Sequence, residues 1–195
     1  MKISLPLLVF VVVLLSWFAF AIVFIVNKPP SAGPTAKRES KSIIGIALQG
    51  AGYASVWIIH RQFFTPIAAM SRPLEITLAI VTIILAISSV WFCAAAVRAL
   101  GKQWSLEARV VEGHNLIMHG PYRIVRNPIY TGMLGMLIAT GLAVSHWIGL
   151  IAGIVICAIG TFIRVRSEEK LLRDMFGKQW DEYARSVPAV VPFVI

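Results

Sequence analysis

The chain is built from long apolar runs that contain no charged side chain. Three of these runs cover residues 3–26, 42–59 and 76–97. A helix needs about 20 apolar residues to cross the hydrocarbon core of a bilayer, so each run predicts one transmembrane helix. The first run is longer than the apolar part of a secretory signal peptide, which has about 7–15 residues, and we therefore expect it to be retained.

A fourth run, residues 131–163, is too long for one such helix. Its 33 residues would extend about 50 Å, against a hydrocarbon core of roughly 30 Å. His146 is the only ionisable residue in this run and stands beside Trp147, a residue type enriched at membrane interfaces. We therefore expect a turn here, with one span at 130–146 and another at 147–163.

Composition also favours a membrane protein. Of the 195 residues 58% are hydrophobic and 14% are charged, against about 45–50% and about 25% in soluble domains. We expect one all-α membrane domain over residues 1–195, with about five transmembrane helices.

The net charge of +9 would suggest nucleic acid only in a more polar chain, so we expect no such partner. Cys93 and Cys157 lie inside apolar runs, so we expect both to be small core residues and not metal ligands.

The connecting segments divide the cations unequally between the two sides of the membrane. If the first helix leads inward, 15 Lys and Arg lie inside, and only Lys2, Arg61 and Arg72 lie outside. Cytoplasmic loops carry such an excess. This predicts an outside N-terminus, with segments 98–129 and 164–195 on the cytoplasmic face. The membrane would be the cell membrane of a prokaryote or the endoplasmic reticulum of a eukaryote.

Small residues spaced four apart predict where two helices approach each other closely. Ser145, Gly149 and Gly153 have this spacing at the start of the fifth predicted span, and Gly50 and Ala54 have it in the second. Backbones can come together where such residues meet, because no large side chain separates them.

The segment 98–129 has the features of a structured cytoplasmic loop. Gly120 and Pro121 interrupt any regular periodicity within it. It ends in Asn127 and Pro128, which favour a helix start because Asn is a good cap and Pro suits the first helical position. The positive end of that helix would face the cytoplasm as a site for a carboxylate or another anion.

The segment 164–195 continues the helical periodicity beyond the fifth span. An amphipathic helix is indicated by Leu172, Met175, Phe176, Trp180 and Tyr183. Gly177 weakens this helix locally.

Two pairs of opposite charges stand four residues apart at the start of this segment. The spacing of Glu169 and Arg173 predicts an ordinary ion pair on the helix surface. Arg164 and Glu168 have the less favourable order for a surface pair, so a buried role and a membrane-anchoring role both stay open for Arg164.

Two separated motifs stand in the polar segments of the chain. The first runs from Gly120 to Gly132 and reads GPYRIVRNPIYTG. The second contains Arg164, the Glu168-Glu169 pair, Phe176-Gly177, Tyr183 and Val187-Pro188. Together they resemble the isoprenylcysteine carboxyl methyltransferase family. The resemblance covers roughly residues 106–193 and is that of a short, prokaryotic-type member.

The resemblance implies a multi-pass membrane enzyme that uses S-adenosylmethionine to methylate the C-terminal carboxylate of a prenylated cysteine, releasing S-adenosylhomocysteine. Arg164 would bind the substrate carboxylate, and the prenyl chain would enter from the bilayer between the spans. The family usually has His where this chain has Asn127, which can still offer an amide hydrogen bond but cannot carry a proton. The cofactor would lie against His114, Asn115, Leu116, Ile117, Tyr122, Asn127, Pro128, Ile129, Tyr130 and Glu168.

The residues suit this chemistry. A carboxylate is already ionised near pH 7, so its attack on a sulfonium methyl group needs no general base. The reaction needs alignment of the two groups and removal of water from the nucleophile. The planar fork of Arg164 can hold the carboxylate, and Glu168 can bind the cofactor ammonium.

Other functions stay open from the residues alone. A phospholipid N-methyltransferase would have to deprotonate an amine headgroup, with Glu169 or His119 as the candidate base. A non-catalytic membrane protein or small transporter is a second alternative, although the spans hold almost no ionisable residue for an ion pathway. A sterol reductase that uses NADPH rests only on analogy of architecture.

Overall fold

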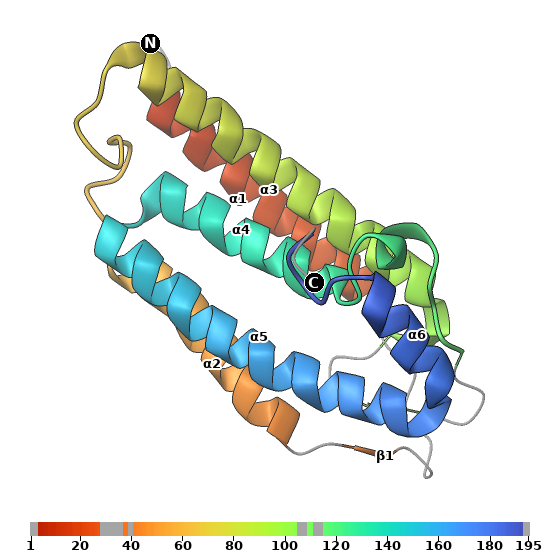
Figure 1. Cartoon of the computed structure of the whole chain (residues 1–195). Coiled ribbons are helices and arrows are strands. Elements are labelled where there is room, and N and C mark those ends of the chain that lie inside the picture. Colours follow the sequence, from red (N-terminus) through yellow and green to blue (C-terminus); the bar gives the residue numbers. More distant parts are fainter. Residues whose placement is uncertain (1–3, 28–36, 39–40, 105–108, 111–114, 193–195) are drawn as a thin grey trace.

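Five long apolar helices run up and down through the molecule, and a short sixth helix lies at one end (Figure 1). This computed structural model describes residues 4–27, 37–38, 41–104, 109–110 and 115–192. The helices are α1 (Leu5–Val26), α2 (Lys41–Ile58), α3 (Arg72–Leu100), α4 (Pro128–Val144), α5 (Trp147–Phe176) and α6 (Lys178–Ser186). The protein is therefore helical throughout its long elements, as the apolar runs predict.

The remaining elements are short. Two turns of 3-10 helix, η1 (Gly101–Gln103) and η2 (Gly120–Arg123), lie between α3 and α4. The two-residue strands β1 (Lys37–Arg38) and β2 (Arg109–Val110) pair antiparallel. They join the segment before α2 to the segment before α4.

Local residues determine where several helices begin and end. Proline occupies the first turn of α1, α3 and α4, where the missing N–H is not needed. The turn predicted at His146 separates α4 from α5, and the His146 ring accepts a hydrogen bond from the backbone N of Ile148 at 3.3 Å. Gly177 has a φ of +51°, which favours glycine, and it ends α5. The predicted amphipathic helix is therefore two helices, α5 and α6.

Three helices, α1, α3 and α5, are long and apolar enough to cross a membrane, while α2 and α4 are apolar but shorter. Large apolar side chains project from the outer faces of the bundle, among them Phe18, Trp91 and Phe162. A soluble protein rarely exposes so much continuous apolar surface. These features are those of a membrane protein.

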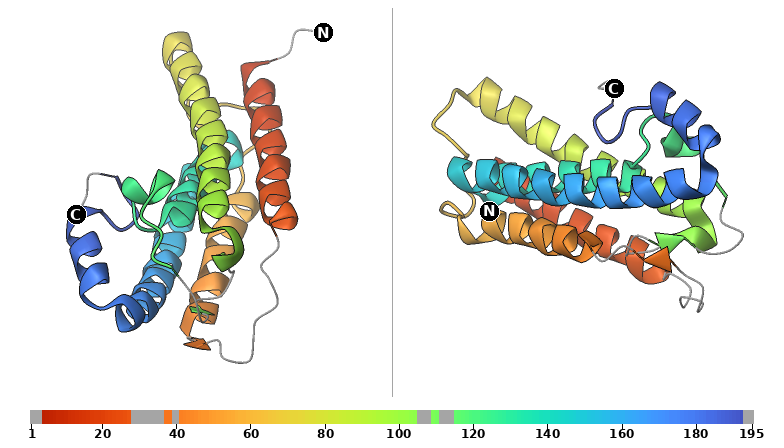
Figure 2. Two further views of the ribbon diagram at one scale, coloured as in Figure 1. Left: turned by 90° about the vertical axis from the view of Figure 1, so that its right-hand side faces the viewer. Right: turned by 60° about the horizontal axis from the view of Figure 1, so that its bottom comes forward.

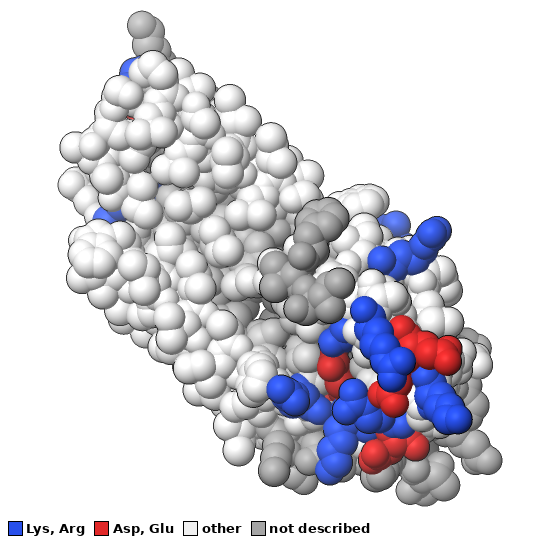
Figure 3. Space-filling view, viewed as in Figure 1, with Lys and Arg blue, Asp and Glu red and all other residues white. Residues whose placement is uncertain are grey.

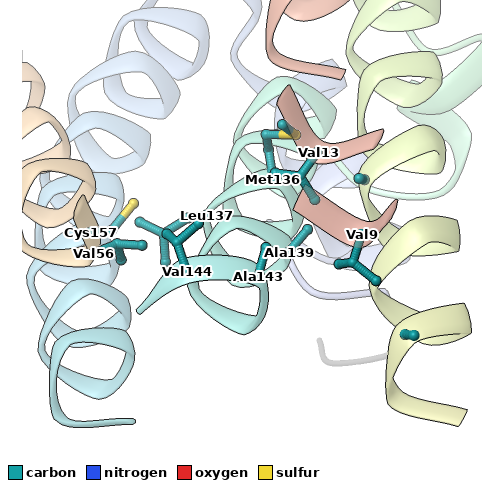
Figure 4. Packing of buried hydrophobic residues seen from close by; sticks show 11 residues of the cluster. Val9, Val13, Val56, Met136, Leu137, Ala139, Ala143, Val144 and Cys157 are labelled. Carbon is teal, nitrogen blue, oxygen red and sulfur yellow. The ribbon is translucent and has the colours of Figure 1, made fainter. Parts of the chain in front are cut away.

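The helices form two groups, which the views of Figure 2 show from the side and from below. α2 lies along α5 in the most extensive helix contact, and α1, α3 and α4 form the second group. α4 connects the groups, and its Met136 and Leu137 are fully buried (Figure 4). The core cluster combines Val9, Val13, Val56, Met136, Leu137, Val144 and Cys157. Cys93 and Cys157 are buried free thiols, as predicted for core residues.

Glycines allow the backbones of α2 and α5 to come together. A Cβ on Gly153 would lie 2.9 Å from the carbonyl oxygen of Gly52, and Gly149 packs equally closely against Ile59. The predicted roles of these two glycines of α5 are therefore confirmed. The prediction for Gly50 is wrong, because nothing lies within 4 Å of a Cβ at that position. Helix phase explains this, since Gly50 and Gly52 face different directions on α2.

Charged side chains gather at one end of the bundle, around the end of α5 and α6 (Figure 3). The start of α4 lies at the same end (Figure 1). The segments 98–129 and 164–195, which hold most of the polar chemistry, thus meet at one end of the apolar helices. The side of the membrane on which they lie stays a prediction.

Two matched substitutions test the packing of α2 against α5. Gly153→Ala would place a Cβ 2.6 Å from Cγ2 of Val56 and force the helices apart. We expect it to destabilise the protein by about 1–3 kcal/mol, the range for overpacked cores. Gly50→Ala adds the same methyl group in open space and should not destabilise. Thermal unfolding in detergent measures both, and equal stability of the two variants would contradict this packing.

Candidate active site

Arg164 is buried near the polar end of α5, with 5% of its surface exposed. Its Nη1 donates to Oε1 of Gln49 at 3.3 Å, and its Nη2 donates to Oε1 of Glu168 at 3.3 Å. The guanidinium carbon lies 5.1 Å from the centre of the Tyr130 ring, within the range of a cation–π contact. Three helices, α2, α4 and α5, therefore position one guanidinium.

Glu168 is the acidic partner in this cluster. The Tyr130 hydroxyl donates to Oε1 of Glu168, the same oxygen that accepts from Arg164. Oε2 accepts no hydrogen bond from the part of the chain that the structure describes. The side chain is 26% exposed, against 6% for that of Arg164. Glu168 thus keeps one oxygen for a further donor.

Glu169 belongs to a second cluster beside the first. Its Oε1 lies 2.9 Å from Nε of Arg126 and accepts from the Asn127 amide at 3.1 Å. The predicted surface pair of Glu169 with Arg173 is wrong, because Arg173 pairs with Asp181 at 2.9 Å. Tertiary packing of α5 against the start of α4 overrides the local pairing.

Asn127 precedes the first residue of α4, but its side chain does not cap the helix as predicted. The amide also donates to the carbonyl of Ala189 at 3.1 Å, and the backbone N of Asn127 donates to the same carbonyl at 3.0 Å. The backbone N of Arg126 donates to the carbonyl of Pro188 at 2.8 Å. Asn127 therefore anchors the segment after α6 across the start of α4.

Tyr122, in η2, connects the site to α6. The Tyr183 hydroxyl donates to the Tyr122 carbonyl at 2.7 Å, and Tyr183 packs with Trp180 and Val187. Burial raises the pKa of the Tyr183 phenol, so it stays protonated and can donate this bond at neutral pH. Burial also raises the pKa of the Tyr122 phenol, and the carboxylate of Glu168 raises it further. The Tyr122 phenol is thus close enough to Glu168 to respond to its charge.

The other predicted cofactor residues lie around these clusters. The backbone N of Asn115 donates to the Gln103 side chain, and Leu116 packs against the Trp180 cluster. Ile117 is half-buried in the same segment. Within the described ranges, none of these three residues is hydrogen-bonded to Arg164 or Glu168. His114 lies outside the described residues.

The first turn of α4 lies next to Asn127. Pro128 is buried as the first residue of the helix, and the carbonyl of Ile129 accepts from Sγ of Cys93 at 3.4 Å. Tyr130 points its hydroxyl at Glu168, as described above. The structure therefore brings together Tyr122, Tyr130, Arg164 and Glu168, with Asn127 in the neighbouring cluster.

Comparison with known proteins now identifies the family. The family described as "Phospholipid methyltransferase" matches residues 77–179, which is more than half of the chain. The chain belongs to the phospholipid methyltransferase family. The match includes the whole of α4, the helix that contributes Tyr130, and α5 with Arg164 and both glutamates.

The curated relatives match only part of this chain and part of their own length. Protein-S-isoprenylcysteine O-methyltransferase B of Arabidopsis thaliana is 37% identical over 89 residues, which cover 46% of this chain and 45% of the relative. Protein-S-isoprenylcysteine O-methyltransferase A of the same plant is 33% identical over 102 residues, 51% and 52% of the two chains. A probable protein-S-isoprenylcysteine O-methyltransferase of Oryza sativa subsp. indica is 33% identical over 81 residues, 42% of each. The chain spans about half the length of the curated relatives it matches.

The sequence alone did not predict one residue that contacts Arg164. Gln49 of α2 is 3% exposed and contacts Arg164, yet it lies outside residues 77–179. A signal for it was present, because Gln49 is the only side-chain amide in the apolar run 42–59. A polar side chain in so apolar a segment is a functional candidate.

Asn127→Asp tests the second cluster. The substitution replaces an amide donor by an acceptor that faces the Glu169 carboxylate and the Ala189 carbonyl. We expect a loss of about 2 kcal/mol in stability, typical of a broken hydrogen bond to a charged group. Thermal unfolding in detergent measures this loss. The Glu169→Gln change should restore part of it in the double variant, because glutamine can donate to the new carboxylate. A variant as stable as the wild type would contradict the assigned bonds.

Proposed function

We propose that this protein is an S-adenosylmethionine-dependent methyltransferase that forms a methyl ester on the C-terminal carboxylate of a prenylcysteine-like lipophilic substrate. The observation that carries the proposal is Arg164, a guanidinium buried at the polar end of an apolar helical bundle. The names of the Arabidopsis relatives support this class of substrate.

Arg164 is suited to bind the substrate carboxylate. A guanidinium presents two parallel N–H donors to a carboxylate, and a site with little water strengthens that contact. The carboxylate is ionised at neutral pH, so no residue has to remove a proton from it. The tasks left to the protein are alignment and exclusion of water, for which a guanidinium held by three helices is well placed.

Glu168 is suited to bind the ammonium group of the cofactor. It keeps Oε2 without a donor among the described residues and is partly exposed, which fits a cationic ligand. The first turn of α4, at Pro128 and Ile129, offers the positive end of a helix to the cofactor carboxylate. S-adenosylmethionine supplies, when bound, a methyl group activated by a sulfonium. We keep His114, Asn115, Leu116, Ile117, Tyr122, Asn127 and Tyr130 as proposed cofactor contacts.

The charges of the proposed site balance. Arg164 and Glu168 cancel each other. The substrate carboxylate carries one negative charge, and the cofactor carries one net positive charge at neutral pH. Since an unbalanced charge is costly in a buried site, a carboxylate substrate suits this pair better than a cationic one.

We further propose that the five long helices are five membrane spans. The helices alternate in direction, and their charged residues gather at one end. The excess of cations places that end, with segments 98–129 and 164–195, in the cytoplasm. The prenyl chain would then reach Arg164 from the bilayer while its carboxylate stays at the interface.

Methylation of a phospholipid amine is the alternative that the family description suggests. It requires a base, for which Glu169 and His119 are the candidates. The Glu169 carboxylate already accepts hydrogen bonds from Arg126 and Asn127, so a substrate amine would have to displace one of these donors. His119 is exposed at the start of η2. The ester proposal therefore has the stronger support.

The chemical nature of the product tests the proposal. Membranes that contain the protein are incubated with methyl-labelled S-adenosylmethionine and a prenylcysteine, and the lipid extract is treated with base. We expect the label to leave as volatile methanol, because methyl esters hydrolyse in base. A base-stable label in a phospholipid would contradict the proposal and support amine methylation.

Matched arginine variants of α5 test the role of Arg164 in the same assay. Arg164→Met removes the carboxylate clamp and should lower kcat/KM at least about 100-fold. Arg173→Met removes an exposed cation of the same helix and should leave kcat/KM within about twofold. Equal effects of the two substitutions would contradict a specific role for Arg164.

Binding of S-adenosylhomocysteine tests the role of Glu168 without turnover. We expect calorimetry in detergent to show binding to the wild type and an affinity about 10-fold lower for Glu168→Gln, because a charged partner of the ammonium is lost. Glu75→Gln is the control, since Glu75 pairs with Arg72 at the other end of the bundle. A folded wild-type protein that does not bind would favour a non-catalytic membrane protein.

A further inference from the structure

Gln49 places a neutral amide beside the buried guanidinium of Arg164. It lies in α2, outside the part of the chain that the family match covers. The side chain is 3% exposed and bridges α2 to α5 through two hydrogen bonds. A buried amide in an apolar helix is costly unless both of its ends are paired, and here they are.

The orientation of this amide is determined by its partners. Arg164 has only donors, so the oxygen of Gln49 must face it, and Nε2 must then point away. Nε2 donates to Oγ1 of Thr161 at 2.9 Å, one helical turn before Arg164 on α5. Thr161 therefore holds the amide in the orientation that accepts from Arg164.

The backbone of α2 reaches Arg164 because glycines meet there. A Cβ on Gly45 would collide with Cγ of Arg164 and lie 2.8 Å from the carbonyl oxygen of Gly160. Gly45 and Gln49 stand four residues apart and so present the same face of α2. One turn of α2 thus encloses the aliphatic part of Arg164 with Gly45 and its Nη1 with Gln49.

We propose that Gln49 is a positioning residue for Arg164, orienting the guanidinium toward a substrate carboxylate without adding a second negative charge to that of Glu168. This inference rests on the proposed function. A carboxylate at position 49 would hold the guanidinium in a similar place, but it would compete with the substrate for its charge. An apolar side chain would leave Nη1 without this acceptor. The neutral amide provides orientation and adds no second negative charge beside that of Glu168.

A residue that only joins α2 to α5 would also need hydrogen bonds, so stability alone does not distinguish the two roles. Tyr53 supplies the matched control. It lies four residues further along α2 and donates to the carbonyl of Met133 in α4 at 2.6 Å. Tyr53→Phe therefore removes one interhelical hydrogen bond of α2 that does not involve Arg164.

The test compares binding of N-acetyl-S-farnesylcysteine with binding of its carboxamide, measured by calorimetry in detergent. The two probes differ only at the group that Arg164 would bind. We expect Gln49→Met to lower affinity for the carboxylate about 10-fold, as for a lost hydrogen bond to a charged group, with little change for the carboxamide. In the methylation assay KM for the carboxylate should rise by a similar factor, and thermal unfolding reports the stability of each variant.

Gln49→Glu keeps the shape and the acceptor and adds a charge. We expect it also to lower affinity for the carboxylate by about 10-fold or more, since it adds a second carboxylate beside Arg164, while Tyr53→Phe keeps the wild-type preference. If Gln49→Met does not fold, Gln49→Glu decides the question alone.

The outcomes separate this inference from the function on which it rests. A wild-type protein that binds neither probe, or binds both equally, contradicts the proposed function. A wild-type preference for the carboxylate that Gln49→Met and Gln49→Glu both retain overturns only the positioning role. A loss of that preference in these variants, and not in Tyr53→Phe, supports it.

Discussion

The close approach of α2 to α5 is the constraint on which the site depends. Gly45 meets Gly160 and Gly52 meets Gly153, so the two backbones come closer than larger side chains would allow. Only at this separation does Gln49 reach Arg164. A guanidinium at the end of an apolar helix is costly to bury, and the acceptor on α2, the carboxylate of Glu168 and the Tyr130 ring together offset that cost. The packing of glycines between α2 and α5 therefore determines the geometry of the site around Arg164.

Two consecutive glutamates of α5 perform different tasks because a helix turns by about 100° between neighbouring residues. Glu168 faces Arg164 and Tyr130, while Glu169 faces Arg126 and Asn127. The second cluster holds the start of α4 against α5 and fastens the segment after α6. It thereby supports the helix that presents Tyr130. An amide suits position 127 because it donates to a carboxylate and to a carbonyl at once.

Much of the fold follows from local patterns in the sequence. The apolar runs correspond to long helices, the turn at His146 is present, and Gly177 interrupts the final helix. Such features depend on residues close together in the chain. The contacts of the site do not, because Gln49 and Arg164 are 115 positions apart and Arg126 and Glu169 are 43 apart. The local pairing rule therefore assigned Glu169 to the wrong arginine, and the spacing of Gly50 and Ala54 indicated the wrong face of α2 for the contact with α5.

The most direct measurement of the central claim is an experimental structure of the protein with S-adenosylhomocysteine and a prenylcysteine bound. The account predicts that the prenylcysteine carboxylate accepts hydrogen bonds from the Arg164 guanidinium, while Gln49 still accepts from Nη1 of Arg164. It also predicts that the amino group of S-adenosylhomocysteine lies against Glu168. A prenylcysteine carboxylate bound elsewhere, with no hydrogen bond from Arg164, would contradict it.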